Sequence, residues 1–171
     1  MMKIMGAVFV VAATTWVGFE FAKRISERPR QLRLFKTALQ SLEAEIMYGH
    51  TPLYEAAERL SKQMPKPLCW LFQAFQTQLE KGDQTVRDAW IESLQKVWKL
   101  TALKQTEYEI LQQFGETLGQ HDRDSQQKHI RLCITHLERE EGEAKDIQLR
   151  YERMMKSLGF LTGLLIVILL L

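Results

Sequence analysis

Apolar side chains through the middle of the chain recur every three or four residues, which is the spacing of one face of an α-helix. No stretch alternates between apolar and polar residues with a period of two, so the pattern predicts no β-sheet. The fold class we expect is therefore all-α. The successive apolar stripes are Leu32, Phe35, Leu39, Leu42 and Ile46; Leu53, Ala56, Ala57 and Leu60; Leu68, Phe72, Phe75 and Leu79; Val86, Ala89, Trp90, Leu94 and Val97; Tyr108, Leu111, Phe114 and Leu118; and Ile130, Cys133, Leu137, Ala144, Ile147, Tyr151, Met154 and Leu158.

Glycine and proline mark the boundaries between these stripes. Gly49, Gly82 and Gly119 each follow a stripe, and glycine is the usual residue at which a helix ends. We expect Thr51 to cap the next helix and Pro52 to occupy its first position. Short turns of this kind predict a compact antiparallel bundle of about six helices over residues 25–156.

The two ends of the chain are apolar and differ from the bundle. Residues 4–19 contain no charged side chain, and with the residues beside them they approach the length of a membrane span. Leu158–Leu171 is a second uncharged run, short for a span and apolar on every face. We expect residues 1–22 to be an N-terminal transmembrane anchor and residues 157–171 a C-terminal membrane anchor. A cleaved signal peptide and a buried core helix are the respective alternatives.

Basic residues lie on the bundle side of both apolar ends. Because positive charge favours the cytosolic side of a membrane, this asymmetry predicts a cytosolic bundle with both termini outside. At that interface the basic side chains orient the chain and attract anionic lipid, and an alternative role is contact with an acidic partner. The expected membrane-interface residues are Lys23, Arg24, Arg28, Arg30, Arg33, Arg150, Arg153 and Lys156.

Composition and motifs give little support to catalysis. The net charge of +2 is too close to zero to indicate a nucleic-acid partner. Neither a phosphate-binding loop nor a hydrolase or metalloprotease motif occurs in the sequence. His129 and His136 lie two helical turns apart with Cys133 between them, an arrangement more typical of a helix face than of a metal site. We therefore expect two reduced cysteines, Cys69 and Cys133, and no catalytic residue, cofactor or metal.

One acidic stretch interrupts the last apolar stripe. Residues 138–143 read EREEGE, and Glu140 occupies the position at which the heptad pattern would place an apolar side chain. Paired carboxylates of this kind can perform acid–base chemistry. The interpretation we favour is a solvent-exposed helix face with ion pairs between neighbouring turns.

Several segments of the bundle have distinctive sequences: RQLR at residues 30–33, ALQSLEAEI at 38–46, YGHTPL at 48–53 and FGETLG at 114–119. Together with the C-terminal apolar run, they resemble the stage III sporulation protein AB family of endospore-forming bacteria over essentially the whole chain. The cytosolic domain of that family is similar to the six-helix domain of the platform protein of type II secretion and type IV pilus machines. The glycine turns at Gly49 and Gly82 resemble the helix-turn pattern of that domain.

The resemblance implies a non-enzymatic scaffold in a channel complex between mother cell and forespore. It implies a place in the mother-cell membrane and a cytosolic partner ATPase, stage III sporulation protein AA, beside other membrane proteins of the channel. Platform proteins of pilus machines usually carry two copies of the domain, whereas this chain has room for one, so a homo-oligomer is a possible form. A membrane-anchored signalling adaptor is the alternative function.

Overall fold

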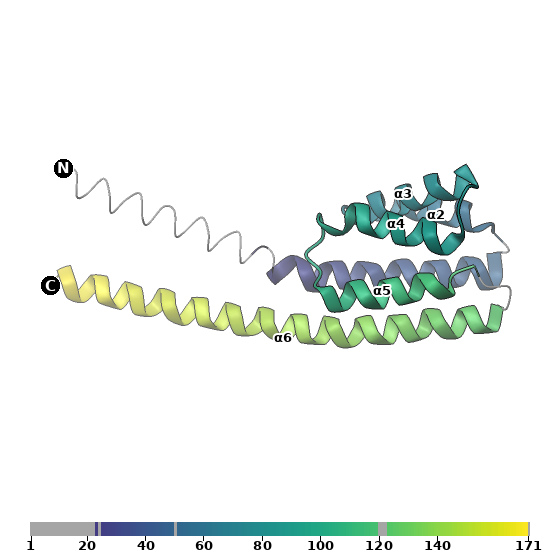
Figure 1. Cartoon of the computed structure of the whole chain (residues 1–171). Helices are drawn as coiled ribbons and strands as arrows, with labels where there is room; N and C mark the ends of the chain where they lie inside the picture. The colour runs from purple at the N-terminus through teal and green to yellow at the C-terminus, as the bar shows by residue number, and fades with distance from the viewer. Residues whose placement is uncertain (1–22, 24, 50, 120–122, 171) are drawn as a thin grey trace, which may run out of the picture.

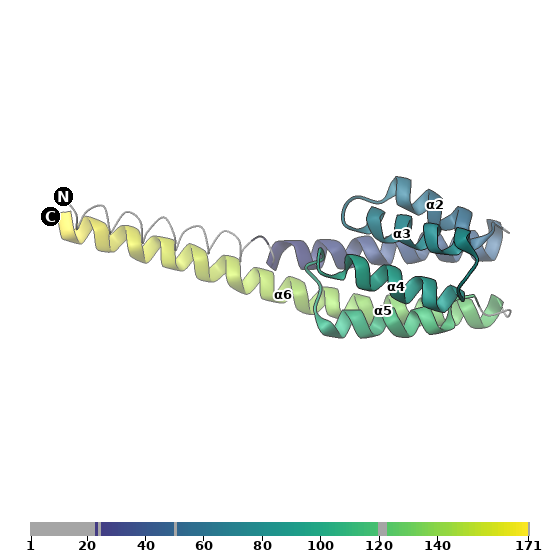
Figure 2. The same ribbon diagram turned by 45° about the horizontal axis from the view of Figure 1, so that its top comes forward.

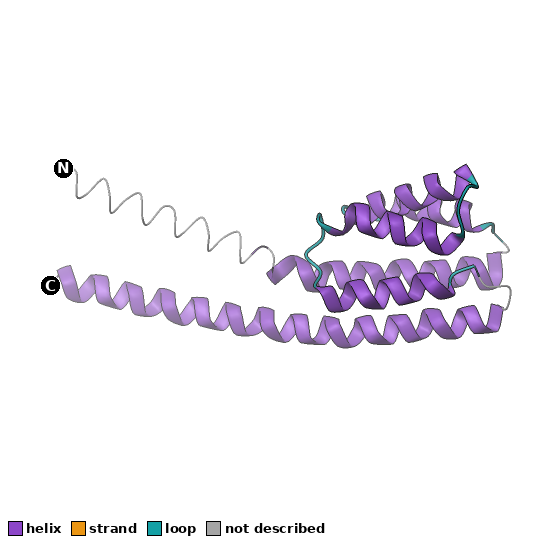
Figure 3. Cartoon of the chain, in the orientation of Figure 1, coloured by secondary structure: helices purple, strands orange, loops and turns teal. Residues whose placement is uncertain are grey.

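Helices make up the regular structure of the protein in the computed structural model, which describes residues 23, 25–49, 51–119 and 123–170, with side chains no further than Met155. No strand occurs in those residues (Figure 3), and the predicted all-α fold is confirmed. The elements are the N-terminal helix at residues 25–44, the π-helical turn η1 (Glu45–Gly49), α2 (Leu53–Gln63), α3 (Leu68–Lys81), α4 (Val86–Trp98), α5 (Gln105–Thr117) and α6 (Arg123–Leu170).

The helices form a bundle in which α2, α3, α4, α5 and α6 each pack against the next along the chain. The N-terminal helix runs beside α6, while α2, α3 and α4 lie on its other side (Figures 1 and 2). The expected bundle of about six helices is therefore confirmed. One helix differs from the rest in length: α6 extends far past the bundle at one end (Figure 1).

Trp90 occupies the centre of the apolar core. Its ring is fully buried and meets Phe75 and Phe114 edge-on, with ring centroids 5.2 and 5.4 Å apart. The indole N–H donates to the backbone oxygen of Leu111 at 2.8 Å, which satisfies the one polar atom of the ring. Most of the predicted apolar positions are buried around it, with Leu32, Leu60, Leu94 and Leu137 as further examples.

The turns follow the sequence with one correction. Gly82 and Gly119 adopt left-handed backbone angles, with φ of 69° and 83°, which glycine accepts without steric cost. Gly49 is the last residue of η1. The prediction that Thr51 caps α2 is wrong. The helix begins one residue later than expected because Pro52 takes the cap position, and the Thr51 hydroxyl donates instead to the carboxylate of Glu45 at 2.8 Å.

The ends of the chain are described only in part. The predicted N-terminal anchor, residues 1–22, lies outside the described residues. The backbone of the predicted C-terminal anchor is helical as far as Leu170, while its side chains also lie outside them. Across the described part of the chain, no helix combines the length and the apolar character that crossing a membrane requires.

Candidate functional site

Arg28 of the N-terminal helix lies inside the bundle and joins three helices. Its Nε donates to Glu107 of α5 at 2.7 Å, and its Nη2 donates to Glu140 of α6 at 3.2 Å. The side chains of Arg28, Glu107 and Glu140 are only 7%, 0% and 6% exposed. Glu107 also accepts the backbone N–H of Lys104, which closes a capping box at the start of α5. Because buried charges require such partners, this buried cluster fixes the N-terminal helix, α5 and α6 relative to one another.

A second group of charges surrounds Glu141, one residue further along α6. Its carboxylate lies 2.9 Å from Lys36 Nζ, 3.3 Å from Arg33 Nε and 2.7 Å from Lys145 Nζ. Burial opposes ionisation of Glu141, but hydrogen bonds from Lys145, Lys36 and Arg33 outweigh it and lower its pKa to about 2. Burial likewise opposes the charge on Lys36, and Glu141 and Glu138 outweigh it and raise the pKa of Lys36.

A third contact lies near the opposite end of the N-terminal helix. Glu43 accepts hydrogen bonds from Gln127 and Arg131 of α6, each at 2.8 Å. The partners of the N-terminal helix therefore come later along α6 as the contacts move from Glu43 back to Arg28. We call this antiparallel set of contacts, from Glu43–Arg131 to Arg28–Glu140, the ion-paired seam.

The seam corrects the interpretation of the acidic stretch at residues 138–143. Glu138 and Glu143 are exposed, as a solvated face requires, with 70% and 56% of their side chains accessible. Glu140 and Glu141 are buried, and their partners come from the N-terminal helix and α5 as well as from neighbouring turns. The physical reason is that this side of α6 faces cations supplied by a segment more than one hundred residues earlier.

The basic residues predicted for a membrane interface occupy different environments. Arg28 is buried in the seam and takes no exposed position. Arg30 is exposed and pairs with Glu27 at 3.0 Å, whereas the exposed Arg33 reaches Glu141. Lys23, Arg150 and Arg153 are exposed, while Arg24 and the side chain of Lys156 lie outside the described residues. Their predicted contact with lipid stays a prediction.

A groove between α5 and α6 is lined by cysteine and histidine, the residue types that most often act as nucleophiles, general bases or metal ligands. It encloses about 190 Å³ and is lined by Cys133, His129 and His136, with Glu116 and Thr117 opposite. Burial raises the pKa of the Cys133 thiol to about 12, so this sulfur is not a nucleophile at neutral pH. In the part of the chain that the structure describes, no three His, Cys, Asp or Glu side chains converge as metal ligands.

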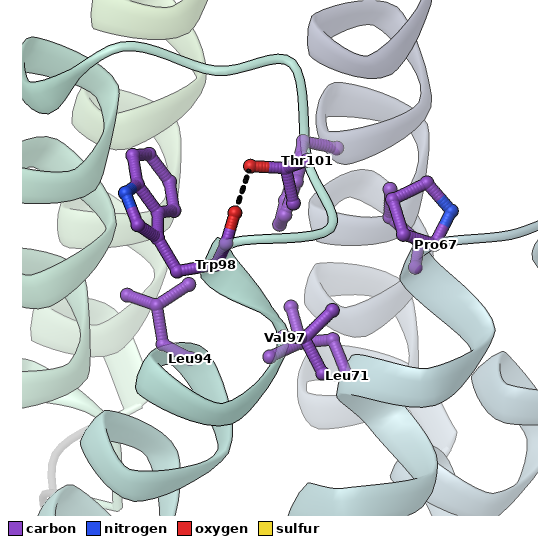
Figure 4. Close-up of a pocket in the computed structure, with 8 residues that line it drawn as sticks. Pro67, Leu71, Leu94, Val97, Trp98 and Thr101 are labelled. Carbon is purple, nitrogen blue, oxygen red and sulfur yellow. Dashed lines mark hydrogen bonds between the residues drawn. The ribbon is translucent and has the colours of Figure 1, made fainter.

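The apolar pocket beside the end of α4 offers no chemistry either. Figure 4 shows Val97 of α4 beside Leu71, with Leu94 and Trp98 on one side and Pro67 on the other. The pocket that these residues line leaves no space for a water molecule. The only hydrogen bond drawn there joins the Thr101 hydroxyl to the backbone oxygen of Trp98, at 2.7 Å. This region is packed core, and the polar feature that distinguishes the protein is the ion-paired seam.

Comparisons with known proteins identify the family of the chain. The family model for stage III sporulation protein AB matches residues 3–171. Stage III sporulation protein AB of Bacillus subtilis (strain 168) is 59% identical over 170 residues, which cover 99% of each chain. A solved structure of a stage III sporulation protein AB is 57% identical, with a TM-score of 0.70 over 72% of this chain and 98% of that one. The chain belongs to the stage III sporulation protein AB family.

Proposed function

We propose that this protein is a membrane-anchored, non-enzymatic platform of the sporulation complex, and that its bundle couples a cytosolic ATPase to the membrane assembly. Residues 1–22 and 157–171 are the membrane anchors in this proposal, and residues 25–156 are the cytosolic bundle. The membrane is the mother-cell membrane of the sporulating cell. Family membership supports the link to sporulation, since the family is named for that process and not for a catalytic activity.

The observation that carries the proposal is the continuity of α6. Its last buried residue in the bundle is Ala144, yet the helix continues without a break to Leu170, about 39 Å further on. An uninterrupted helix transmits a displacement along its axis. A partner that moves the bundle would therefore move the apolar run at residues 158–171, to which the bundle is directly joined.

In this proposal, exposed basic side chains determine on which side of the membrane the bundle lies. Lys23, Arg150 and Arg153 are exposed where the two terminal segments leave the bundle. Positive side chains next to apolar segments favour the cytosolic face and attract anionic lipid headgroups. The same charges therefore support a cytosolic bundle that a cytosolic ATPase can reach.

The partner ATPase is stage III sporulation protein AA, and the other partners are the remaining membrane proteins of the sporulation channel. Arg28, Arg33 and Lys36 each pair with a buried carboxylate of another helix. Arg30 is 59% exposed and pairs only with Glu27 of its own helix, so it is better placed than these three to contact an acidic surface. A single bundle per chain supports assembly as a homo-oligomer, because pilus platforms carry two such domains in one chain.

Binding of the ATPase to the full-length chain in lipid nanodiscs tests the coupling. We expect saturable binding that Arg30→Glu weakens. Arg59→Glu is the matched control, because Arg59 is also an exposed, ion-paired arginine but lies on α2. If the folded ATPase fails to bind with and without nucleotide, direct coupling is wrong. Equal loss in both variants would instead indicate a non-specific effect of charge.

The membrane topology has a separate test. In a chain without Cys69 and Cys133, single cysteines at Asp83, Met2 and Leu171 are labelled in intact cells with an impermeant reagent. We expect the terminal probes to be labelled from outside and the probe at Asp83 to be protected. Labelling at Asp83 would place the bundle outside the cytosol and contradict the ATPase-coupled platform.

A further inference from the structure

Two connections between helices lie together at the end of the bundle from which α6 extends. Pro67, in the turn between α2 and α3, and Thr101, in the loop between α4 and α5, line the same packed pocket (Figure 4). The loop also contacts the N-terminal helix, because the backbone N–H of Ala102 donates to the side-chain oxygen of Gln31 at 2.8 Å. Figure 1 shows this loop on the side of the bundle from which α6 continues.

Every charged side chain in these two connections is a lysine. Residues 62–67 read KQMPKP, and residues 99–104 read KLTALK. The first lysine of the turn and the last of the loop are ion-paired. Lys66 and Lys99 are exposed and form no ion pair with any residue that the structure describes. Since α3 begins at this end, the turn that follows it lies at the opposite end, and residues 82–85 read GDQT, with an aspartate as the charged residue.

Two large apolar side chains accompany the unpaired lysines. Trp70 is 38% exposed, and Lys66 Nζ lies 5.0 Å from the centre of its ring. Leu100, next to Lys99, is 58% exposed. Tryptophan and lysine together are typical of a membrane–water interface, where apolar parts contact the acyl boundary and the ammonium group meets headgroup phosphates. We call Lys66, Trp70, Lys99 and Leu100 the lysine surface.

We propose that the lysine surface lies against a bilayer surface that contains anionic lipid. The proposal rests on the proposed function, because a membrane anchor is what brings the bundle beside a bilayer. An acidic protein would match the charge equally well, but the position of the surface favours lipid. The helix α6 leaves the bundle on this side and leads to the apolar run at residues 158–171.

The proposed contact sets the inclination of α6. Lys104, at the end of the α4–α5 loop, lies 3.5 Å from Glu143 of α6, and Leu158 is fifteen residues further along, about 22 Å. A bundle upright on α6 would hold the lysine surface away from the headgroups. Inclination of α6 towards the side of α2, α3 and α4 shortens the gap, and membrane-crossing helices incline by up to about 40°. Electrostatic attraction extends about 8–10 Å at moderate ionic strength, so it acts before the side chains reach the headgroups.

Proximity between the bundle and the lipid headgroups tests the proposal in the full-length chain. In a background without Cys69 and Cys133, a fluorophore is attached at Gln63→Cys, beside the lysine surface, or at Asp83→Cys, in the turn at the opposite end. The chain is placed in phosphatidylcholine nanodiscs with and without phosphatidylglycerol, and both contain a lipid with a spin label on its headgroup. Because a spin label quenches only a nearby fluorophore, we expect phosphatidylglycerol to increase quenching at residue 63 and to leave residue 83 unchanged.

Charge variants identify the groups that make the contact. Lys66→Glu combined with Lys99→Glu should return quenching at residue 63 to its level in phosphatidylcholine alone. Each lysine near an anionic surface strengthens the attraction about fivefold, so loss of both should weaken the contact at least about 25-fold. The matched control is Lys81→Glu combined with Lys128→Glu, which changes the net charge equally. These two lysines are also exposed and without an ion pair among the described residues, and the control should keep the quenching.

Each outcome decides the proposal. Quenching at residue 63 that requires phosphatidylglycerol, Lys66 and Lys99, but not Lys81 and Lys128, supports the lysine surface. The same quenching should fall as salt is added, which tests the contact without any substitution. Quenching that does not respond to phosphatidylglycerol overturns the proposal and leaves an acidic protein as the partner. Equal loss in both double variants also overturns it.

Vesicles separate this proposal from the proposed function. If the full-length chain does not insert into nanodiscs, the membrane anchors are wrong, and the labelled chain is then mixed with vesicles of the two lipid compositions. Quenching at residue 63 that depends on phosphatidylglycerol would still support the lysine surface. Stable insertion without that quenching contradicts the lysine surface alone.

Discussion

Removal of the guanidinium of Arg28 is the most direct test of the buried cluster. Arg28→Ala leaves Glu107 and Glu140 in place, with side chains only 0% and 6% exposed and without their common cation. Glu107 retains the backbone N–H of Lys104, whereas Glu140 keeps mainly a long contact of 3.4 Å with Arg139. The substitution therefore strands buried carboxylates while it removes a side chain that joins three helices.

The expected loss is large compared with the stability of a domain of this size. Breaking a buried ion pair by removing one partner costs about 3–5 kcal/mol, against a total of about 5–15 kcal/mol for a small domain. A matched variant separates the charge effect from lost packing. In the triple variant Arg28→Met, Glu107→Gln and Glu140→Gln, the cluster is replaced by neutral groups of similar size, and we expect most of the loss to be recovered.

Urea unfolding of the 25–156 fragment measures these differences. The signal is tryptophan fluorescence, to which the fully buried Trp90 contributes beside Trp70 and Trp98. Arg30→Ala is the control, because Arg30 is 59% exposed and its pair with Glu27 should contribute no more than about 0.5 kcal/mol. If Arg28→Ala costs no more than Arg30→Ala, the buried cluster does not stabilise the bundle. If the triple variant is as unstable as the single one, unpaired charge is not the cause.

Three further predictions concern single positions. Gly115→Ala should lower the free energy of unfolding by about 1–3 kcal/mol in the same urea assay, because an added Cβ would overlap the ring of Trp90. Gly142→Ala should raise it by about 0.5–1 kcal/mol, since nothing lies within 4 Å of the added carbon and alanine favours the helix. The lowered pKa of Glu141 predicts stability that is present above its ordinary value of 4.5 and is lost as the pH falls towards 2. At neutral pH the free energy of unfolding of the wild type should therefore exceed that of Glu141→Gln by about 1–2 kcal/mol, a figure reduced for solvent screening because the partners of Glu141 are exposed. Unfolding measured at several pH values should show this difference disappear between pH 4.5 and pH 2. An advantage that persists at pH 2 would contradict this assignment.

Apolar periodicity was sufficient to predict the helices and most of the core. Leu32, Phe35 and Leu39 on the first stripe and Ala89, Trp90 and Leu94 on the fourth are all buried, because a single face of a helix must pack against its neighbours. Periodicity did not predict the close approach of Gly115 to Trp90. The two residues lie on different helices, and periodicity within one helix carries no information about which residues meet across the bundle.

The buried charges show where sequence reasoning stopped. Glu140 interrupts the apolar stripe of α6, and taken alone it indicates a defect in the core or an exposed position. Its partner Arg28 lies 112 residues away in sequence and, read locally, belongs to a basic cluster beside a membrane. Each residue was misinterpreted because its partner comes from another helix. A signal was nevertheless present, since a carboxylate in a core position requires a buried cation somewhere in the chain.

The ion-paired seam determines the register of the N-terminal helix and α6 more strictly than their apolar stripes do. Apolar contacts have little directionality, so two striped helices can slide by one turn, about 5.4 Å, and still bury similar areas. The same slide would separate Arg28 from Glu140 and Lys36 from Glu141, and an unpaired buried charge costs several kcal/mol. The charges therefore penalise every register except the observed one.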